Sequence, residues 1–352
     1  MPSQPMKIVI PDLVSHCDFP LRCNPCEAQA SLECKEWLFR GGKMSEKKKS
    51  AFHGLKAGLL TSWCYPKASY NELRVCCDFM NWLFHLDNIS DDMNDYGTSR
   101  TAVDIMNALY HPHTYSPVSP EGRMTQDYWR RLIPTATPGT QQRFMETMDF
   151  FFQAVTQQAV DRANGVVPDL DSYIALRRDT SGCKPCWALI EYAYNLDIPD
   201  EVMEHPVIVS LGEAANDLVT WSNVRHPAFS FMCLIFIDVF MQDIFSYNVE
   251  QSKGDTHNMI VVMMKQEGLD LQGAVEFVGN LCKQSIDRFV EDRGNLPSWS
   301  PEIDRQVETY VEGLADWIVG SLHWSFESER YFGKTGLEVK QTRVVDLLPR
   351  RS

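Results

Sequence analysis

The chain lacks an excess of positive charge, and this absence limits its partners. It has 33 Lys and Arg residues against 47 Asp and Glu residues, which gives a formal net charge of −14 at pH 7. A protein that binds nucleic acid would present a basic face, so no nucleic-acid partner is expected. A small anionic ligand is not excluded, because a bound cation can reverse the local field.

Long hydrophobic runs are also absent. The most apolar stretch, AFSFMCLIFIDVFM at 228–241, contains Asp238 and is too short for a helix that crosses a bilayer. The first residues, MPSQPMKIVIPDLV, show no basic segment followed by a long apolar core, so they do not predict a secretory signal. We therefore expect a cytoplasmic protein with reduced thiols and no membrane anchor.

The eleven cysteines show no strong metal or redox pattern. Two Cys-x-x-Cys pairs occur, Cys23–Cys26 and Cys183–Cys186. A zinc site would need both pairs together, and a redox pair would need a βαβ setting. Free thiols are the simpler interpretation.

Alternating strand patterns are scarce, whereas helical periodicity is frequent. Proline and glycine cluster between the periodic segments, and no internal repeat or low-complexity tract occurs. We predict an all-α fold with one domain at 15–335, a C-terminal tail at 336–352, and flexible ends near 1–20 and 335–352. Apolar residues recur at three- and four-residue spacings in 26–40, 45–62, 70–90, 101–110, 139–163, 184–195, 206–223, 243–266, 269–291 and 301–328.

A first acidic motif lies in LFHLDNISDDMND at 83–95. Asp87 and Asp91 are four residues apart and would share one face of a helix. Carboxylates at the end of an apolar helix form a hard oxygen site that suits Mg²⁺. Taken alone, an acidic helix end in solvent is the simpler interpretation on so negative a chain.

A second motif lies in DIFSYNVEQ at 243–251. Ser246 and Glu250 are four residues apart, so a helix places them on one face. A third ligand on that face would stand at Gln242. An amide, a hydroxyl and a carboxylate in this order offer three oxygen ligands to one Mg²⁺.

Together the two motifs resemble those of the class I terpene synthases, most closely the fungal (basidiomycete-type) sesquiterpene synthases. The family's first motif, D[DEN]xx[DE], matches Asp87–Asp91, and its second motif is NDxx[ST]xxxE. Here the second motif is interrupted between Asn223 and Asp243. Without residues 224–242 the chain reads WSNDIFSYNVEQSKGD. The resemblance then implies that Asn223, Ser246 and Glu250 are metal ligands.

Residues 224–242 have two interpretations. The segment begins with Val-Arg, which GTRAGR would encode, and ends with Gln, which CAG would encode. These are splice-site sequences in frame, and an apolar block at a polar site breaks local consistency, so we favour a retained intron. The alternative is a genuine insertion in which the amide oxygen of Gln242 replaces that of Asn223.

A similar stretch, Asn216-Asp217-Leu-Val-Thr220, begins like the second motif. The fourth residue after Thr220 is Val224 rather than Glu. We interpret this stretch as the preceding turns of the same helix.

The resemblance implies further site residues. Arg177, in SYIALRRDTSG, would sense the diphosphate, with Arg178 as the alternative. Thr180 would be the linker, and Ser181 would be the effector at a helix break whose backbone dipole faces the nascent cation.

Near the C-terminus, Arg330 and Tyr331 of SERYFG would bind the diphosphate. Relatives carry a basic residue just before the Glu of the second motif. Here Val249 holds that place, and Lys253 follows a turn later as a further candidate.

The implied activity is the Mg²⁺-dependent ionisation and cyclisation of farnesyl diphosphate to a cyclic sesquiterpene, with release of diphosphate. The family binds three Mg²⁺ ions in a helical bundle around a central apolar cavity, and it acts on this small molecule as a monomer or homodimer. Candidate pocket residues are Phe79 and Leu83, two turns and one turn before Asp87 respectively, together with Ser181. Three further aromatic candidates are Trp187, Phe245 and Trp324.

Three alternatives to this activity are considered. No DxDD sequence occurs, so protonation-initiated cyclisation is unsupported, and a single Asp-rich motif argues against a chain-elongating prenyltransferase. The remaining alternative is a catalytically impaired or inactive helical protein, because a translated 224–242 would separate Asn223 from Ser246.

Overall fold

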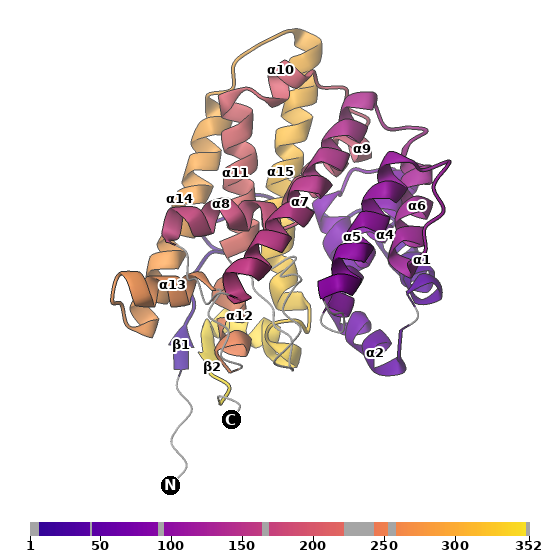
Figure 1. Ribbon diagram of the computed structural model, residues 1–352. Helices are drawn as coiled ribbons and strands as arrows, with labels where there is room; N and C mark the ends of the chain where they lie inside the picture. Colours follow the sequence, from indigo (N-terminus) through magenta and orange to yellow (C-terminus); the bar gives the residue numbers. More distant parts are fainter. Residues whose placement is uncertain are drawn as a thin grey trace.

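The computed structural model describes residues 7–42, 44–90, 95–163, 169–221, 243–252 and 258–349. Within these ranges the regular structure is almost entirely helical (Figure 1), so the all-α prediction is confirmed. The helices are α1 (Glu27–Gly41), α2 (Glu46–Leu55), α3 (Ala57–Cys64), α4 (Tyr70–Ser90), α5 (Asp95–Tyr110), α6 (Pro120–Leu132), α7 (Pro138–Ala163), α8 (Leu170–Thr180), α9 (Cys183–Tyr194), α10 (Asp200–Met203), α11 (Pro206–Trp221), α12 (Asp243–Gln251), α13 (Met259–Gln266), α14 (Leu271–Gly294), α15 (Pro301–Glu327) and α16 (Gly336–Thr342). The remaining elements are the strands β1 (Lys7–Val9) and β2 (Val344–Asp346) and the 3-10 turn η1 (Gly333–Thr335).

Two of the predicted helices are divided in the structure. The segment 45–62 contains α2 and α3, which meet at Lys56, a residue with φ of 53° in the left-handed region. This conformation cannot continue a right-handed helix. The segment 243–266 contains α12 and α13, so the predicted continuous helix is wrong there as well.

Four helices, α6, α8, α10 and α16, lie outside the segments predicted from periodicity. The two longest of them, α6 and α8, each follow a capping side chain. Ser119 Oγ accepts a hydrogen bond from the backbone N of Gly122 at 2.9 Å, and Pro120 occupies the first turn of α6. Asp169 Oδ1 accepts one from the backbone N of Ser172 at 2.8 Å at the start of α8. Both signals are present in the sequence.

The two ends of the chain pair with each other. β1 and β2 form an antiparallel sheet in which Ile8 lies opposite Val345. Beyond the sheet, the backbone N of Ile10 donates to the carbonyl O of Arg343 at 2.8 Å. The described residues of the predicted flexible ends are therefore held by the fold, and both ends lie on the same side of the molecule as α12 (Figure 1).

The N-terminal segment continues along the helices after β1. The ring of Phe19 packs edge-on against Phe289 of α14, with centroids 5.5 Å apart. Arg22 Nη2 then lies 2.8 Å from Asp316 Oδ1 of α15. These contacts explain why the segment is ordered despite its lack of regular structure.

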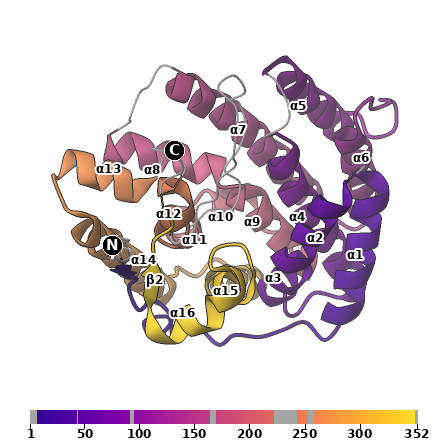
Figure 2. The ribbon, with the colours of Figure 1, turned by 90° about the horizontal axis from the view of Figure 1, so that it is seen from below.

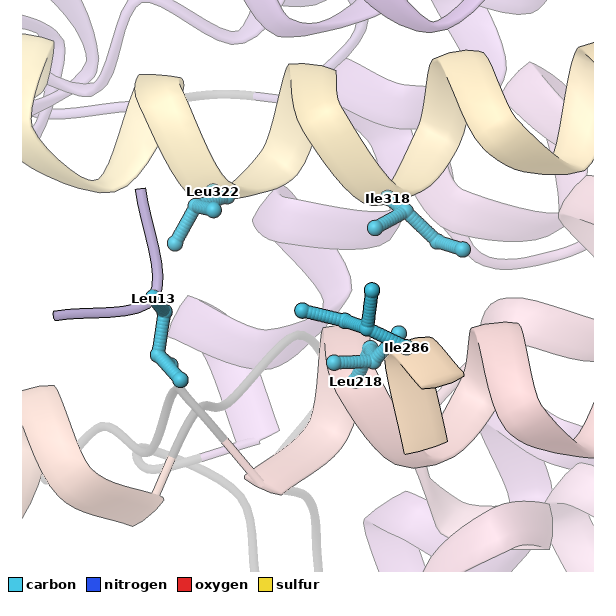
Figure 3. A pocket seen from close by; sticks show the side chains of 5 residues that line it. All are labelled: Leu13, Leu218, Ile286, Ile318 and Leu322. Carbon is cyan, nitrogen blue, oxygen red and sulfur yellow. The ribbon is translucent and has the colours of Figure 1, made fainter. Parts of the chain in front are cut away.

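Helix α15 forms the centre of the core. From Tyr310 to Phe326 every residue is buried except Glu312 and His323. A small cavity of about 10 Å³ lies where α15 meets α11, α14 and the N-terminal segment (Figure 3). This volume has room for about one water molecule and for no organic ligand. The aliphatic side chains that line it are Leu13, Leu218, Ile286, Ile318 and Leu322.

None of the helices in the described ranges is both long enough and apolar enough to cross a membrane.

Asp78 on α4 provides a test of how buried charge affects stability. Its carboxylate is fully buried and pairs with Arg74 and Arg131, with Oδ2 2.6 Å from Arg131 Nη2. Burial raises the pKa of Asp78 to about 6, and the charge of Arg74 opposes this shift. Since the folded state then holds this proton more tightly than the unfolded state, the contribution of Asp78 to stability is lost as the pH rises from about 4 to 6. We expect Asp78→Asn to flatten the pH dependence of the melting temperature in that interval, measured by circular dichroism. An unchanged slope would contradict this assignment.

Candidate active site

A break between α8 and α9 lies at the position predicted for Ser181. Helix α8 ends at Thr180, and Gly182 adopts a φ of 68° before α9 begins at Cys183. Ser181 is buried, and its Oγ accepts a hydrogen bond from the backbone N of Cys183 at 3.1 Å. The predicted helix break is confirmed, and Thr180 beside it is also buried.

Arg177 lies one turn before this break and faces the start of α12. It is buried, and its Nη2 lies 3.5 Å from Oδ1 of Asp243, the first residue of α12. The other carboxylate oxygen of Asp243 accepts hydrogen bonds from Tyr173 Oη at 2.7 Å and from the backbone N of Met259 at 2.9 Å. Burial raises the pKa of Asp243 to about 6, and the charge of Arg177 opposes this rise. The ion pair between Asp243 and Arg177 therefore links α8 to α12, the helix that carries Ser246.

Arg178 forms ion pairs with α11 rather than with α12. Its Nε and Nη2 form a bidentate pair with Asp217 at 2.7 and 2.8 Å, and its Nη1 lies 2.8 Å from Glu213. Arg288 also donates to Asp217 at 2.9 Å. These contacts point Arg178 toward α11 and α14, so of the two arginines it is Arg177 that lies beside α12.

The polar side chains of Asn216–Thr220, the stretch that begins like the second motif, also have partners within the fold. Asn216 donates to the backbone carbonyl of Arg178 at 2.8 Å, and Thr220 donates to Asn216 Oδ1 at 2.7 Å. With Asp217 bound by two arginines, these three side chains have structural partners. They lie in α11, which ends at Trp221, whereas Ser246 and Glu250 lie in α12. That this stretch shares one helix with the second motif stays a prediction, because residues 222–242 lie outside the described part.

The predicted pair Arg330 and Tyr331 follows α15 and lies beside the end of α4. The guanidinium carbon of Arg330 is 5.1 Å from the ring centroid of Phe84 and 5.8 Å from that of Tyr331. These are cation–π distances. Phe84 stands three residues before Asp87 on α4, so Arg330 reaches the helix end that carries the first acidic motif.

Aromatic contacts join this region to α12. The ring centroid of Phe245 lies 5.0 Å from that of Phe326 at the end of α15 and 5.7 Å from that of Phe332. Trp324 packs edge-on against Tyr331 at 6.0 Å. Figure 2 shows α12 between α8 and α15 in the view from below. Helix α8 and the end of α15 thus contact α12, and Arg330, in the segment after α15, reaches the end of α4.

The predicted metal ligands are only partly within the described residues. Asp87 lies in the last turn of α4, and Ser246 and Glu250 lie in α12, whose helical backbone places them on one face as predicted. The side chains of these three residues do not belong to the described part. Asp91, Asn223, Lys253 and the segment 224–242 with Gln242 lie outside it.

Oxygen donors of this kind fit a magnesium ion. Mg²⁺ is a hard cation that takes oxygen ligands, commonly one or two carboxylates together with waters and substrate phosphates. Across the described ranges, no group of three or more His, Cys, Asp or Glu side chains is arranged to hold a metal. The four cysteines of the two Cys-x-x-Cys pairs form no disulfide.

The predicted pocket residues are all buried, but Phe79 has evident packing partners. Its ring lies 5.7 Å from Trp82, 5.8 Å from Tyr128 and 5.2 Å from Phe144, in a cluster between α4, α6 and α7. Leu83 is also fully buried. These contacts give Phe79 a core role, and its contact with substrate stays a prediction.

The further aromatic candidates are also part of the core. Trp187 packs against Trp317 at 5.4 Å and donates to the carbonyl O of Gly212 at 3.2 Å. Trp324 donates to the carbonyl O of Leu55 at 2.8 Å.

Sequence reasoning missed the roles of Tyr173 and Asp243. Tyr173 stands four residues before Arg177, so the two share a face of α8. That spacing is the signal that would have joined them. Asp243 was noted within the second motif, but its contact with Arg177 depends on how α8 and α12 pack.

Comparison with known proteins assigns the family. Residues 78–288 match the family described as terpene synthase family 2, C-terminal metal binding. This chain belongs to the terpene synthases. The synthase is 71% identical over 350 residues to Sesquiterpene synthase 1 of Postia placenta, which covers 99% of this chain and 98% of that relative.

Other relatives agree with this assignment. Sesquiterpene synthase Agr1 of Cyclocybe aegerita is 64% identical, over 98% of the synthase and 94% of the relative. Alpha-muurolene synthase of Coprinopsis cinerea is 52% identical, over 98% of the synthase and 78% of that relative. The sequence-based recognition of a fungal sesquiterpene synthase family is confirmed.

The fold has solved counterparts. The crystal structure of germacradien-4-ol synthase from Streptomyces citricolor superposes with a TM-score of 0.71, at 24% identity, over 87% of the synthase and 98% of that chain. At this identity the likeness concerns the fold, and it confirms the predicted class I helical bundle.

Proposed function

We propose that the synthase ionises farnesyl diphosphate and cyclises the resulting cation to a cyclic sesquiterpene, with release of diphosphate. The observation that carries this proposal is the 71% identity to a named sesquiterpene synthase over nearly the whole of both chains. The contacts of α8 and α15 with α12, and of Arg330 with the end of α4, support it, because these elements carry predicted site residues.

The predicted ligands for Mg²⁺ are Asp87 and Asp91 on one side and Asn223, Ser246 and Glu250 on the other. When bound, the ions, three by family resemblance, would supply Lewis-acid and electrostatic stabilisation of the leaving diphosphate. Gln242 is the alternative ligand to Asn223 if 224–242 is part of the active protein.

The cationic residues of the chain would stabilise the diphosphate as the C–O bond breaks and its electron pair leaves with oxygen. We assign this role to Arg177, Arg330 and Lys253, with the hydroxyl of Tyr331 as an added donor. Arg177 is supported by its burial beside α12, where Asp243 holds it. Arg330 is supported by its place against Phe84 near the first motif.

The carbocation must be kept from water in an apolar cavity. We propose that Phe79, Leu83 and Ser181 contribute to that cavity. Aromatic faces stabilise positive charge without offering a strong nucleophile. The carbonyl end of α8 at Ser181 carries the negative pole of the helix dipole, which favours a nearby cation.

We further propose that the synthase acts in the cytoplasm as a monomer or homodimer. The described cysteines are free thiols, which fits a reducing compartment.

The proposed substrate is tested by incubating the purified chain with farnesyl, geranyl and geranylgeranyl diphosphates, and measuring diphosphate release with Mg²⁺ or with EDTA. We expect release with farnesyl diphosphate to be fastest and to stop in EDTA. Release that is equally fast in EDTA, or that requires a different prenyl length, would contradict the proposal.

A further inference from the structure

The C-terminal segment returns to α12 after it has passed α4. Asn248 of α12 donates from Nδ2 to the carbonyl O of Asp346 at 2.9 Å, and its Oδ1 accepts from the backbone N of Leu348 at 2.6 Å. Gln251 Nε2 adds a bond to the carbonyl O of Leu348 at 2.7 Å. Both ends of the Asn248 carboxamide are therefore used to hold β2 and the residues after it.

The helical register separates this contact from the predicted ligands. Ser246 and Glu250 lie about 40° apart around the axis of α12, because each residue turns the helix by about 100°. Asn248 then lies on the opposite side of the helix. The C-terminal segment therefore contacts α12 through Asn248, on the side opposite the predicted ligands.

The same segment also touches the other motif helix. Arg330 lies over Phe84 at the end of α4, and Phe332 packs against Phe245 of α12. One continuous stretch from 328 to 348 thus spans the two helices that carry the predicted metal motifs. The distance between those motifs depends on where this stretch is fixed.

We propose that Asn248 is a positioning residue: by fixing the C-terminal segment on the back of α12, it sets the place of Ser246 and Glu250 relative to the first motif and Arg330. This inference rests on the proposed function. Groups that orient metal ligands typically change metal affinity or activity by about 10- to 100-fold when they are removed.

The test compares Asn248→Ala with a matched control. Gln272 on α14 holds the other strand of the same sheet by the same chemistry, since its carboxamide makes two 3.0 Å bonds to the backbone N and O of Val9. Gln272→Ala therefore loosens the sheet without touching α12. Both variants are made in the full chain.

Two measurements separate positioning from general stability. In calorimetric titrations with Mg²⁺ and inorganic diphosphate, we expect Asn248→Ala to weaken binding about 10-fold and Gln272→Ala to change it less than twofold. Asn248→Gln, which keeps the carboxamide, is expected to recover most of the affinity. In hydrogen exchange, amides 244–252 should exchange faster only in Asn248→Ala.

Equal effects of the two alanine variants, or unchanged exchange in 244–252, would overturn the inference. Glu250→Gln distinguishes this failure from a failure of the proposed function. If Glu250→Gln weakens binding and Asn248→Ala does not, the positioning role alone is wrong. If Glu250→Gln binds Mg²⁺ and diphosphate as the parent chain does, the ligand assignment is wrong and the inference falls with it.

Discussion

Replacing Arg177 with Lys is expected to lower kcat/KM for farnesyl diphosphate by about 10³-fold, or roughly 4 kcal/mol of transition-state stabilisation. Lys keeps the positive charge beside Asp243, so the buried carboxylate retains a partner. Lys lacks the planar guanidinium group of Arg, which can donate two hydrogen bonds to a diphosphate at once. The effect should therefore appear in turnover rather than in folding, measured as steady-state kinetics alongside the melting temperature.

Arg178→Lys is the matched control for this prediction. It alters the neighbouring arginine, whose bidentate pair with Asp217 is structural. We expect a lower melting temperature and a change in kcat/KM of less than about 10-fold. If Arg178→Lys lost more activity than Arg177→Lys, the two roles would be exchanged, and the placement of Arg177 beside α12 would have no catalytic meaning.

Glu250→Gln and Asp87→Asn should each lower kcat/KM by about 10³-fold, because each removes a charged ligand from the predicted magnesium site. The deficit should shrink as the Mg²⁺ concentration rises, since weaker binding is partly overcome by mass action. Kinetics over a range of Mg²⁺ concentrations measure this directly.

The exposed Glu267, at the end of α13, provides the control. Glu267→Gln makes the same chemical change outside the predicted site and should leave the Mg²⁺ dependence unaltered. Full turnover in Glu250→Gln or Asp87→Asn would remove these residues from the ligand set.

Much of the fold could be predicted because helical periodicity reports burial on one face. The segment 70–90 coincides with α4, whose apolar face is continuous. The periodic segments omitted α6, although its apolar residues recur at helical spacing and are buried: Met124, Tyr128, Trp129 and Leu132. At α8 the capping residue Asp169 marks the helix start. Periodicity failed at Lys56, because a single left-handed residue leaves the apolar pattern of its neighbours unchanged.

The candidate site could be predicted in its motifs but not in its contacts. The family resemblance predicted Arg177 and the helix break at Ser181, and the structure confirms the break. The contact of Asp243 with Arg177 joins α8 to α12 across 66 residues, and no local pattern encodes it. Phe79 shows the same limit, because its position before Asp87 is also a position in the aromatic core between α4, α6 and α7.

The most direct test of the central claim compares two forms of the chain, one as written and one without Val224–Gln242. Each is incubated with farnesyl diphosphate and Mg²⁺, and the hydrocarbons are identified by gas chromatography–mass spectrometry. We predict that the shortened form yields cyclic sesquiterpenes and that the chain as written yields far less, because the shortening rejoins Asn223 to the second motif. Comparable product from the chain as written would show that 224–242 is tolerated and that Gln242 or a looped segment completes the site. Absence of cyclic product from both forms would contradict the assignment of this chain as a sesquiterpene cyclase.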